Sequence, residues 1–348
     1  MYNVSVSKEG NGFAKADKTG LIEQLNRLIN TEQRFVCVSR PRRFGKSMAI
    51  KMLSAYYNAE SNSDELFKDL EIGKAKSYKK HLNQYDVIRI NMTDFIGRTN
   101  SSEELLKQLE IRVIEEFKEK YPDIVHAGNE GSLAWVMQDV YRRKERYFVI
   151  LVDEWDCIFR EYKDKKEEQG KYLDFLRNWL KDKEYIALAY MTGILPIKKY
   201  GTHSALNMFT EYSMTNAGTL AGYFGFQEEE VRELCERYQM SFEDTKTWYD
   251  GYHLGKVESI YNPRSVVGAM LANTFDTYWN QTETFEALRT YIDMNYDGLK
   301  DAIIKMLAGE QVQIDVRSFV NDMTTFHSYE DVLTLLVHLG YLAYDREK

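Results

Sequence analysis

The residues best suited to chemistry lie in a loop with the sequence SRPRRFGKS, which ends at Gly45-Lys46-Ser47. An apolar run precedes this loop, and an amphipathic stretch follows it. The loop matches the end of the pattern G-x-x-x-x-G-K-[ST], whose backbone N–H groups cradle phosphate oxygens at a helix N-terminus, except that Arg40 replaces the first glycine. In such a P-loop, we expect Lys46 to bridge the β- and γ-phosphates of a nucleotide and the Ser47 hydroxyl to ligate Mg²⁺.

The basic residues of the loop leave more than one interpretation open. We expect the loop to bind nucleotide through the run Arg40, Pro41, Arg42, Arg43, Phe44, Gly45, Lys46 and Ser47. Its arginines could meet the phosphates, a partner or nearby carboxylates, because a guanidinium group pairs well with anions. A loop tied by simple salt bridges is the alternative for the arginines. A chance Gly-Lys-Ser at the start of a helix is the alternative for the whole motif.

A second motif adds a pair of carboxylates. The apolar run 148–152 ends in Asp153 and Glu154, which is the Walker B arrangement. We expect Asp153 to hold Mg²⁺, usually through its water shell, and Glu154 to orient and polarise an attacking water. Two exposed acids after a buried strand are the alternative. Because the two motifs occur together and in the expected order, the sequence favours nucleotide hydrolysis over passive binding.

Polar residues also follow the other apolar runs. Thr192 could touch the γ-phosphate or the attacking water as a sensor, and a hydroxyl that caps the strand end is the alternative. Asn91 could hold the catalytic glutamate inactive until a γ-phosphate or a partner is present. Arg177 could act as an arginine finger on a neighbouring subunit, or it could be a solvated charge. Lys198 and Lys199 could approach the γ-phosphate, although surface lysines are the more common case.

These residues must be positioned by alternating strands and helices. Short apolar runs predict strands at 35–38, 86–90, 147–152 and 185–191, and helical spacing predicts helices at 21–29, 48–57, 102–120, 132–145 and 170–182. Strands separated by helices indicate a doubly wound parallel α/β sheet, which binds ligands at the carboxyl ends of its strands. We expect strand 86–90 beside the Walker B strand, as an inserted element of the additional-strand class of P-loop NTPases.

The character of the chain changes after about residue 222. Amphipathic segments predict helices at 227–238, 264–274, 283–293, 297–308 and 329–339, and no later run is as apolar as 147–152. We therefore expect a nucleotide-binding domain over residues 1–222 and a mainly α-helical lid or accessory domain over residues 223–348. The segment Trp248–Tyr252 is expected to form a packed turn between two of these helices.

Composition excludes several classes of protein. The 348 residues are 44% hydrophobic and 29% charged, which is enough for a sizeable core and suits two domains. The 46 basic and 54 acidic residues give a net charge of −8, which argues against a global grip on nucleic acid but leaves a local basic patch possible. Three distant cysteines predict no disulfide framework and suit a reducing cytoplasm, and no apolar run is long enough to span a membrane.

Several motifs together resemble a bacterial and archaeal family called AAA-ATPase-like. The similar stretches are ADKTGLI (16–22), SRPRRFGKS (39–47), LVDEWD (151–156), TGILPIKKYG (192–201), WYDGY (248–252) and IYNP (260–263). The loop of this family also lacks the first glycine, which accounts for Arg40. The resemblance implies an ATP-binding P-loop NTPase with an all-helical C-terminal lid. Members often carry a C-terminal PD-(D/E)XK nuclease-like domain, which we do not expect here because the chain stops at Lys348.

The sequence therefore predicts an ATP-binding, Mg²⁺-dependent P-loop ATPase whose hydrolysis drives a conformational switch. The alternative is a nucleotide-gated binding module that recruits a protein or nucleic-acid partner with little turnover. A degenerate P-loop that binds nothing is a third possibility. A homo-oligomer is possible, and no membrane partner is expected.

Overall fold

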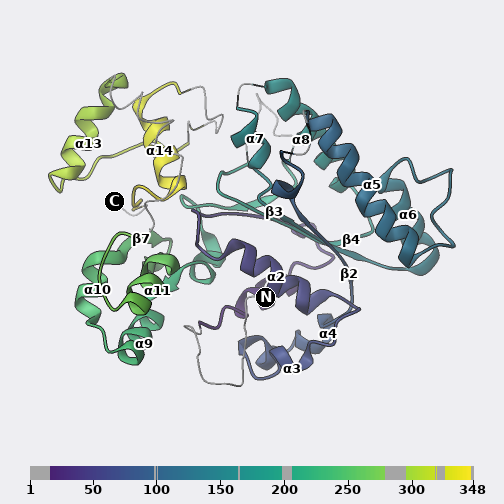
Figure 1. Ribbon diagram of the computed structural model, residues 1–348, viewed down its shortest axis with the longest axis horizontal. Helices are drawn as coiled ribbons and strands as arrows, with labels where there is room; N and C mark the ends of the chain where they lie inside the picture. Colours follow the sequence, from purple (N-terminus) through teal and green to yellow (C-terminus); the bar gives the residue numbers. More distant parts are fainter. Residues whose placement is uncertain are drawn as a thin grey trace.

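A parallel five-stranded sheet forms the centre of the first part of the chain (Figure 1). The computed structural model describes residues 16–97, 99, 101–163, 165–197, 206–278, 295–317, 319 and 326–345. The strands are β1 (Phe35–Ser39), β2 (Asp86–Asn91), β3 (Phe148–Asp153), β4 (Ile186–Gly193) and β5 (Thr210–Tyr212). Their order across the sheet is β2-β3-β4-β1-β5. This confirms the expected parallel α/β sheet, and the carboxyl ends of all strands meet at one edge.

The order of the strands in the sheet agrees only in part with the order predicted from the sequence. β2 pairs with β3, with Asn91 opposite Asp153, as predicted for the strand beside the Walker B motif. The strand inserted between β1 and β3 is β4 rather than β2, because β4 pairs with both of them. The edge strand β5 was not predicted, since its sequence Thr-Glu-Tyr is short and partly exposed and forms no apolar run.

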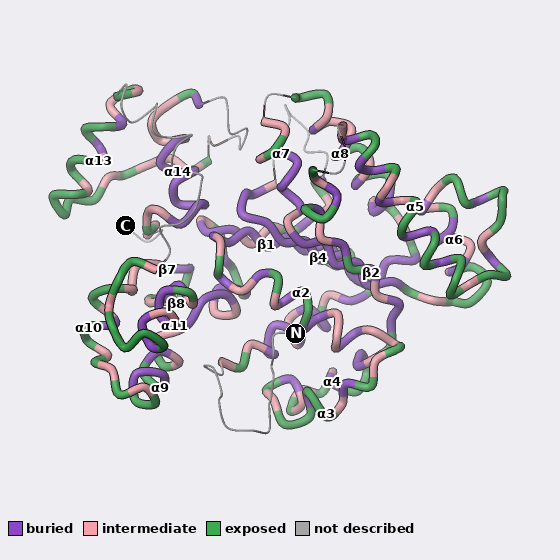
Figure 2. Tube along the Cα trace, viewed as in Figure 1, coloured by how far each residue is buried: buried purple, intermediate pink, exposed green. Residues whose placement is uncertain are grey.

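Helices cover both faces of the sheet, as a doubly wound fold requires. They are α1 (Gly20–Asn26), α2 (Lys46–Tyr57), α3 (Asp64–Phe67), α4 (Tyr78–His81), α5 (Ser102–Lys120), α6 (Leu133–Lys144), α7 (Cys157–Glu161) and α8 (Lys166–Leu180), with 3₁₀ helices η1 (Glu71–Lys74) and η2 (Met92–Asp94). Phe148 and Ile150 of β3 pack on one face with α5 to α8, whereas Val149 and Leu151 pack on the other with α1 to α4. Figure 2 shows the resulting buried band along the sheet.

The rest of the chain is mainly helical but also contains a small sheet. Its helices are η3 (Gly218–Tyr223), α9 (Glu228–Tyr238), α10 (Phe242–Tyr249), α11 (Pro263–Ala272), η4 (Tyr296–Gly298), α13 (Leu299–Leu307) and α14 (Tyr329–Leu339). The antiparallel strands β6 (Phe226–Gln227), β7 (Asp250–Leu254) and β8 (Val257–Tyr261) lie among them in the order β6-β8-β7. The expected helix at 283–293 lies outside the described residues. No helix within the described ranges has the length and apolar character that crossing a membrane requires.

The small sheet corrects two expectations. The C-terminal region is not all helical, because a two-residue connection at Gly255 and Lys256 joins β7 and β8 into a hairpin. Gly255 has φ +63°, a left-handed conformation that glycine adopts without strain. The segment Trp248–Tyr252 is not a turn between helices, because its first two residues end α10 and the others begin β7.

Candidate functional site

The loop between β1 and α2 turns through left-handed backbone conformations at Arg43 (φ +68°) and Gly45 (φ +94°). Gly45 is the N-cap of α2, and its carbonyl accepts bonds from the N–H groups of Met48 (3.1 Å) and Ala49 (3.0 Å). The first N–H groups of a helix have no partner within that helix. The groups at Lys46 and Ser47 therefore form the positive end of α2, which suits an anion such as phosphate.

Lys46 lies beneath this loop and is buried. Its Nζ donates hydrogen bonds to the carbonyl oxygens of Arg40 (3.0 Å) and Pro41 (2.9 Å), which fixes the ammonium group at the base of the loop. Burial lowers the pKa of Lys46, and the negative charges of Glu154 and two other nearby carboxylates oppose this shift. The two sequence motifs thus lie close enough in space for their charges to interact.

Ser47 and Asp153 line the same cleft, which has a volume of about 640 Å³. Asp153 is buried, and its Oδ1 accepts bonds from the N–H of Glu154 (3.0 Å) and from Oγ1 of Thr192 (3.5 Å). The described residues contain no cluster of three or more His, Cys, Asp or Glu side chains that could hold a metal ion. A hydroxyl and one carboxylate at a phosphate loop fit Mg²⁺, which takes few protein ligands and keeps waters and phosphates as the others.

Thr192 ends up at the site, as expected from its place at the end of β4. Its side chain is fully buried and bonds the Asp153 carboxylate rather than capping a backbone group. Whether it senses a phosphate stays a prediction. In contrast, the side chain of Asn91 bonds Thr93 and Asp94, and so it is not the residue that holds Glu154.

Glu154 is held instead by Arg160, which sequence reasoning missed. Glu154 has φ +53°, an uncommon conformation for a residue with a side chain. Its Oε2 accepts a hydrogen bond from Nη2 of Arg160, and the side chains are 22% and 13% exposed, respectively. Burial raises the pKa of Glu154, whereas the positive charges of Lys46 and Arg160 lower it.

Asp156 ties the turn after β3 to the end of β4. It is fully buried, and its Oδ2 accepts bonds from the N–H groups of Ile194 (3.0 Å) and Leu195 (2.8 Å). A Cβ at Gly193 would lie 2.6 Å from the other carboxylate oxygen of Asp156, so only glycine fits there. Asp156 lies within the LVDEWD stretch, but nothing in its spacing indicated this role.

Arg40, expected among the nucleotide-binding residues, directs its side chain into the protein. The guanidinium donates from Nη1 to the carbonyls of Ser39 (2.9 Å) and Tyr212 (2.8 Å) and lies 5.4 Å from the ring centroid of Phe224. Complete burial lowers the pKa of Arg40 to about 10. Its backbone N–H donates to the carbonyl of Gly193 at 3.1 Å. Arg40 therefore joins β1 to β5 and to the end of β4.

Phe44 anchors the loop to the C-terminal region. It is buried in a cluster with Met214, Ala217, Ala221, Leu254, Ile260 and Val337. Its ring meets that of Tyr252 edge-on at 5.3 Å, and its carbonyl accepts a bond from the N–H of Gly225 (3.2 Å). Arg42 is half-buried and Arg43 exposed, so these two arginines remain near the surface of the loop.

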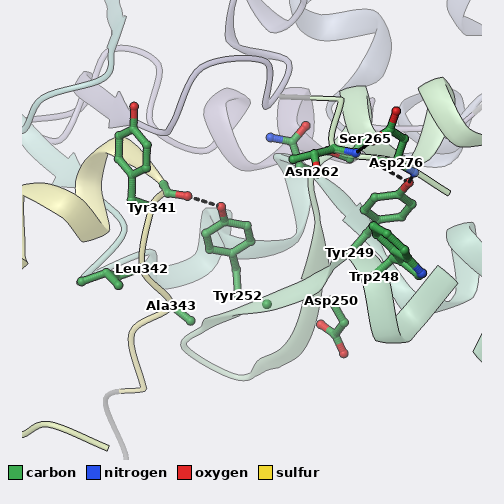
Figure 3. A pocket seen from close by; sticks show the side chains of 13 residues that line it. Trp248, Tyr249, Asp250, Tyr252, Asn262, Ser265, Asp276, Tyr341, Leu342 and Ala343 are labelled. Carbon is green, nitrogen blue, oxygen red and sulfur yellow. Dashed lines mark hydrogen bonds between the residues drawn. The ribbon is translucent and has the colours of Figure 1, made fainter. Parts of the chain in front are cut away.

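Pro41 makes a second contact with the C-terminal region. A Cβ at Gly340, the residue after α14, would lie 2.8 Å from Cβ of Pro41, so the two backbones pack closely. The Tyr252 hydroxyl donates to the carbonyl of Gly340 at 2.6 Å, at the edge of a cavity of about 290 Å³ (Figure 3). The segment Trp248–Tyr252 thus helps to hold the end of α14 against the loop between β1 and α2.

A buried histidine in α14, His338, is expected to make the free energy of unfolding depend on pH. Burial, with a smaller effect of Arg40, lowers the pKa of His338 from 6.5 to about 3. The unfolded chain therefore takes up a proton as the pH falls below about 6.5, while the folded chain does not until about pH 3. Stability contributed in this way is complete above pH 6.5 and is lost toward pH 3, by at most about 1.4 kcal/mol per pH unit.

We expect His338→Leu to weaken this pH dependence. In thermal unfolding experiments, lowering the pH from 7 to 5 should reduce the melting temperature of the wild type more than that of the variant. His253→Leu, at an exposed histidine of β7, is the matched control and should follow the wild type. Equal slopes for His338→Leu and the wild type would contradict the assignment.

Arg177 lies far along α8 from this site. It is exposed in the last turn of α8, and the chain then enters the start of β4, at the sheet edge opposite the carboxyl ends. The structure therefore does not bring Arg177 to the site of its own chain. Lys198 and Lys199 lie outside the described residues.

Comparison with known proteins agrees with this geometry. The sequence model of the family described as Predicted AAA-ATPase matches residues 7–202, more than half of the chain. This chain belongs to that family. The match spans the loop, the Walker B motif and the end of β4. An uncharacterised protein encoded in the vnfD 5′ region of Azotobacter chroococcum mcd 1 is 24% identical over 287 residues, or 80% of this chain. The chain covers 52% of the length of that relative.

Two solved structures are similar to this predicted AAA-ATPase. The Walker-type ATPase Paby2304 of Pyrococcus abyssi has a TM-score of 0.36 and 12% identity, with 84% of this chain and 74% of that chain covered. DnaA from Aquifex aeolicus, solved with bound AMPPCP, has a TM-score of 0.35 and 11% identity, with 88% and 74% covered.

Proposed function

We propose that this predicted AAA-ATPase binds ATP at the loop before α2 and hydrolyses it with Mg²⁺. The observation that supports this most is the convergence of a buried ammonium, a hydroxyl and two carboxylates at one edge of the sheet: Lys46, Ser47, Asp153 and Glu154. This is the set of groups that phosphoryl transfer to water uses.

Each group has a separate task in the proposed reaction. The N–H groups at the start of α2 and the Lys46 ammonium hold the β- and γ-phosphates. Ser47 and Asp153 would hold Mg²⁺, which would supply positive charge near the phosphate oxygens. The Glu154 carboxylate accepts a proton from the water that attacks the γ-phosphorus, the bond to the bridging oxygen breaks, and ADP and inorganic phosphate leave.

We also propose that the C-terminal region, divided from the core near residues 222 and 223, responds to the nucleotide. The support is the attachment of Phe44 and Pro41 to β7, β8 and the end of α14, because a shift of the loop would be felt there directly. The exposed position of Arg177 is compatible with a contact to a neighbouring copy of the chain. The free, buried cysteines Cys37, Cys157 and Cys235 fit a cytoplasmic location.

The ion pair of Glu154 with Arg160 favours a second candidate function. A glutamate that stays paired would leave the chain as a nucleotide-gated module, which recruits a protein or nucleic-acid partner with little turnover. The two functions differ in the rate of phosphate release and agree on ATP binding.

Removal of Mg²⁺ tests the proposed hydrolysis. When EDTA is added, we expect steady-state phosphate release from ATP to fall to the rate measured in buffer without protein. The rate should return when Mg²⁺ is added in excess. Release that persists in EDTA would contradict a metal-dependent reaction. ATP binding with no release at any Mg²⁺ concentration would favour the binding module.

A further inference from the structure

We propose that Arg160 is a positioning residue that restrains the Glu154 carboxylate and so limits the rate of hydrolysis. This rests on the proposed function, because a restraint on Glu154 has a measurable consequence only if Glu154 activates water. The following observations on the Walker B turn support it.

Arg160 contacts two carboxylates, one fixed by further hydrogen bonds and one not. Its Nε lies 3.5 Å from Oδ2 of Asp156, while Nη2 bonds Glu154. Asp156 is fixed, because it is fully buried and the same oxygen accepts two backbone N–H groups after β4. A planar guanidinium can bridge two acids in a defined geometry, whereas an ammonium acts as a point charge. Asp156 therefore serves as the support, and Glu154 is the group that is held.

Glu154 has no comparable attachment to the rest of the protein. Within the described part of the chain, its carboxylate makes a hydrogen bond only to Arg160, and its backbone adopts a left-handed conformation. A carboxylate held in an ion pair is turned toward its partner and away from an attacking water, so it is poorly placed to accept the water's proton. Turnover then requires that the pair opens.

The surroundings offer a way to open the pair. Lys46 and Arg160 both act on Glu154, so two cations lie near this carboxylate, together with the carboxylates of Asp153 and Asp156. The γ-phosphate of ATP would add negative charge beside these cations and compete with Glu154 for them. Arrival of the triphosphate would thus weaken the restraint on the residue that activates the attacking water, which couples binding to activation.

Two substitutions at Arg160 test this restraint. Arg160→Gln removes the charge, and Arg160→Lys keeps the charge but loses the fork that spans both acids. We expect both to raise kcat for ATP hydrolysis, by about tenfold if the pair in the ATP-bound protein is open for a tenth of the time, with KM no higher than in the wild type because the pair no longer opposes binding. The double variant Arg160→Gln with Glu154→Gln should show no rise, because the gain acts through Glu154. Arg142→Gln, at an exposed arginine of α6, is the control.

Each result has a defined meaning. A fall in kcat for both variants would overturn the proposal and place Arg160 among the groups that stabilise the reacting phosphate. A lysine variant equal to the wild type in kcat would also overturn it, because charge balance alone would then explain the ion pair. If Arg160→Gln unfolds, the lysine variant alone decides. Binding of a non-hydrolysable ATP analogue by the wild type tests the proposed function separately, since it does not depend on Arg160.

Discussion

Glu154→Gln is expected to lower the rate of ATP hydrolysis by about 10²- to 10⁴-fold, the usual contribution of a general base. Glutamine has nearly the same size as glutamate and can accept a bond from Arg160, but it cannot take up the proton of the attacking water. ATP binding should be retained, because the phosphates are held by the loop and Lys46. Single-turnover phosphate release and equilibrium binding of ATP measure the two properties independently.

The control for this variant is Glu161→Gln, at an exposed glutamate that ends α7. It removes the same charge from the same segment and should leave the rate within about twofold of the wild type, as is usual for surface substitutions. If Glu154→Gln and Glu161→Gln turn over ATP at equal rates, Glu154 is not the base.

Lys46→Ala should weaken ATP binding by roughly 100-fold or more, which corresponds to about 2.7 kcal/mol. The ammonium is buried beneath the loop, where water screens its charge poorly, so its attraction to phosphate is strong. The variant also loses hydrogen bonds to the carbonyls of Arg40 and Pro41, so the loop should be less ordered. An ATP-dependent rise in melting temperature, present in the wild type and absent in the variant, is the simplest measurement.

Lys51→Ala is the matched control, because Lys51 lies on the same helix and lines the same cleft but is exposed. It should keep the ATP-dependent shift. If Lys46→Ala also keeps the ATP-dependent rise in melting temperature, Lys46 does not hold the phosphates. The loop would then be a structural element that binds no nucleotide.

Strands β1, β3 and β4 of the central sheet were predictable because they are buried at every position. β3 is buried at every position, and a continuous apolar run of that length identifies a central parallel strand from sequence alone. β5 and β7 are short and partly exposed, and they owe their structure to partners distant in the sequence. Local pattern therefore indicates the core and misses the edge strands.

The candidate site was predictable to the extent that its motifs are local. The positions of Lys46 and Glu154 follow from their places after β1 and β3. The pairing of Glu154 with Arg160 does not, because it depends on a left-handed turn at Glu154 and on a helix of five residues, α7. Asn91, which follows β2 in the sequence, was the natural alternative but bonds its own turn.

The buried side chains of the loop were its least predictable part. Arg40 and Phe44 lie within the predicted phosphate-binding motif, and the sequence predicts that they contact the ligand. The structure buries both side chains, because the C-terminal region supplies an apolar cluster for Phe44 and the carbonyl of Tyr212 accepts a bond from Arg40. Only the fold reveals that the loop has two sides, one toward the cleft and one toward the C-terminal region.

The most direct test of the account is the identity of the nucleotide that stays with the protein. Wild type and Glu154→Gln are each mixed with ATP and Mg²⁺, separated from free nucleotide, and extracted for chromatography. We predict ADP from the wild type and ATP from the variant. Unchanged ATP from the wild type, or no nucleotide from either protein, would contradict an ATPase that uses Lys46 to bind and Glu154 to hydrolyse.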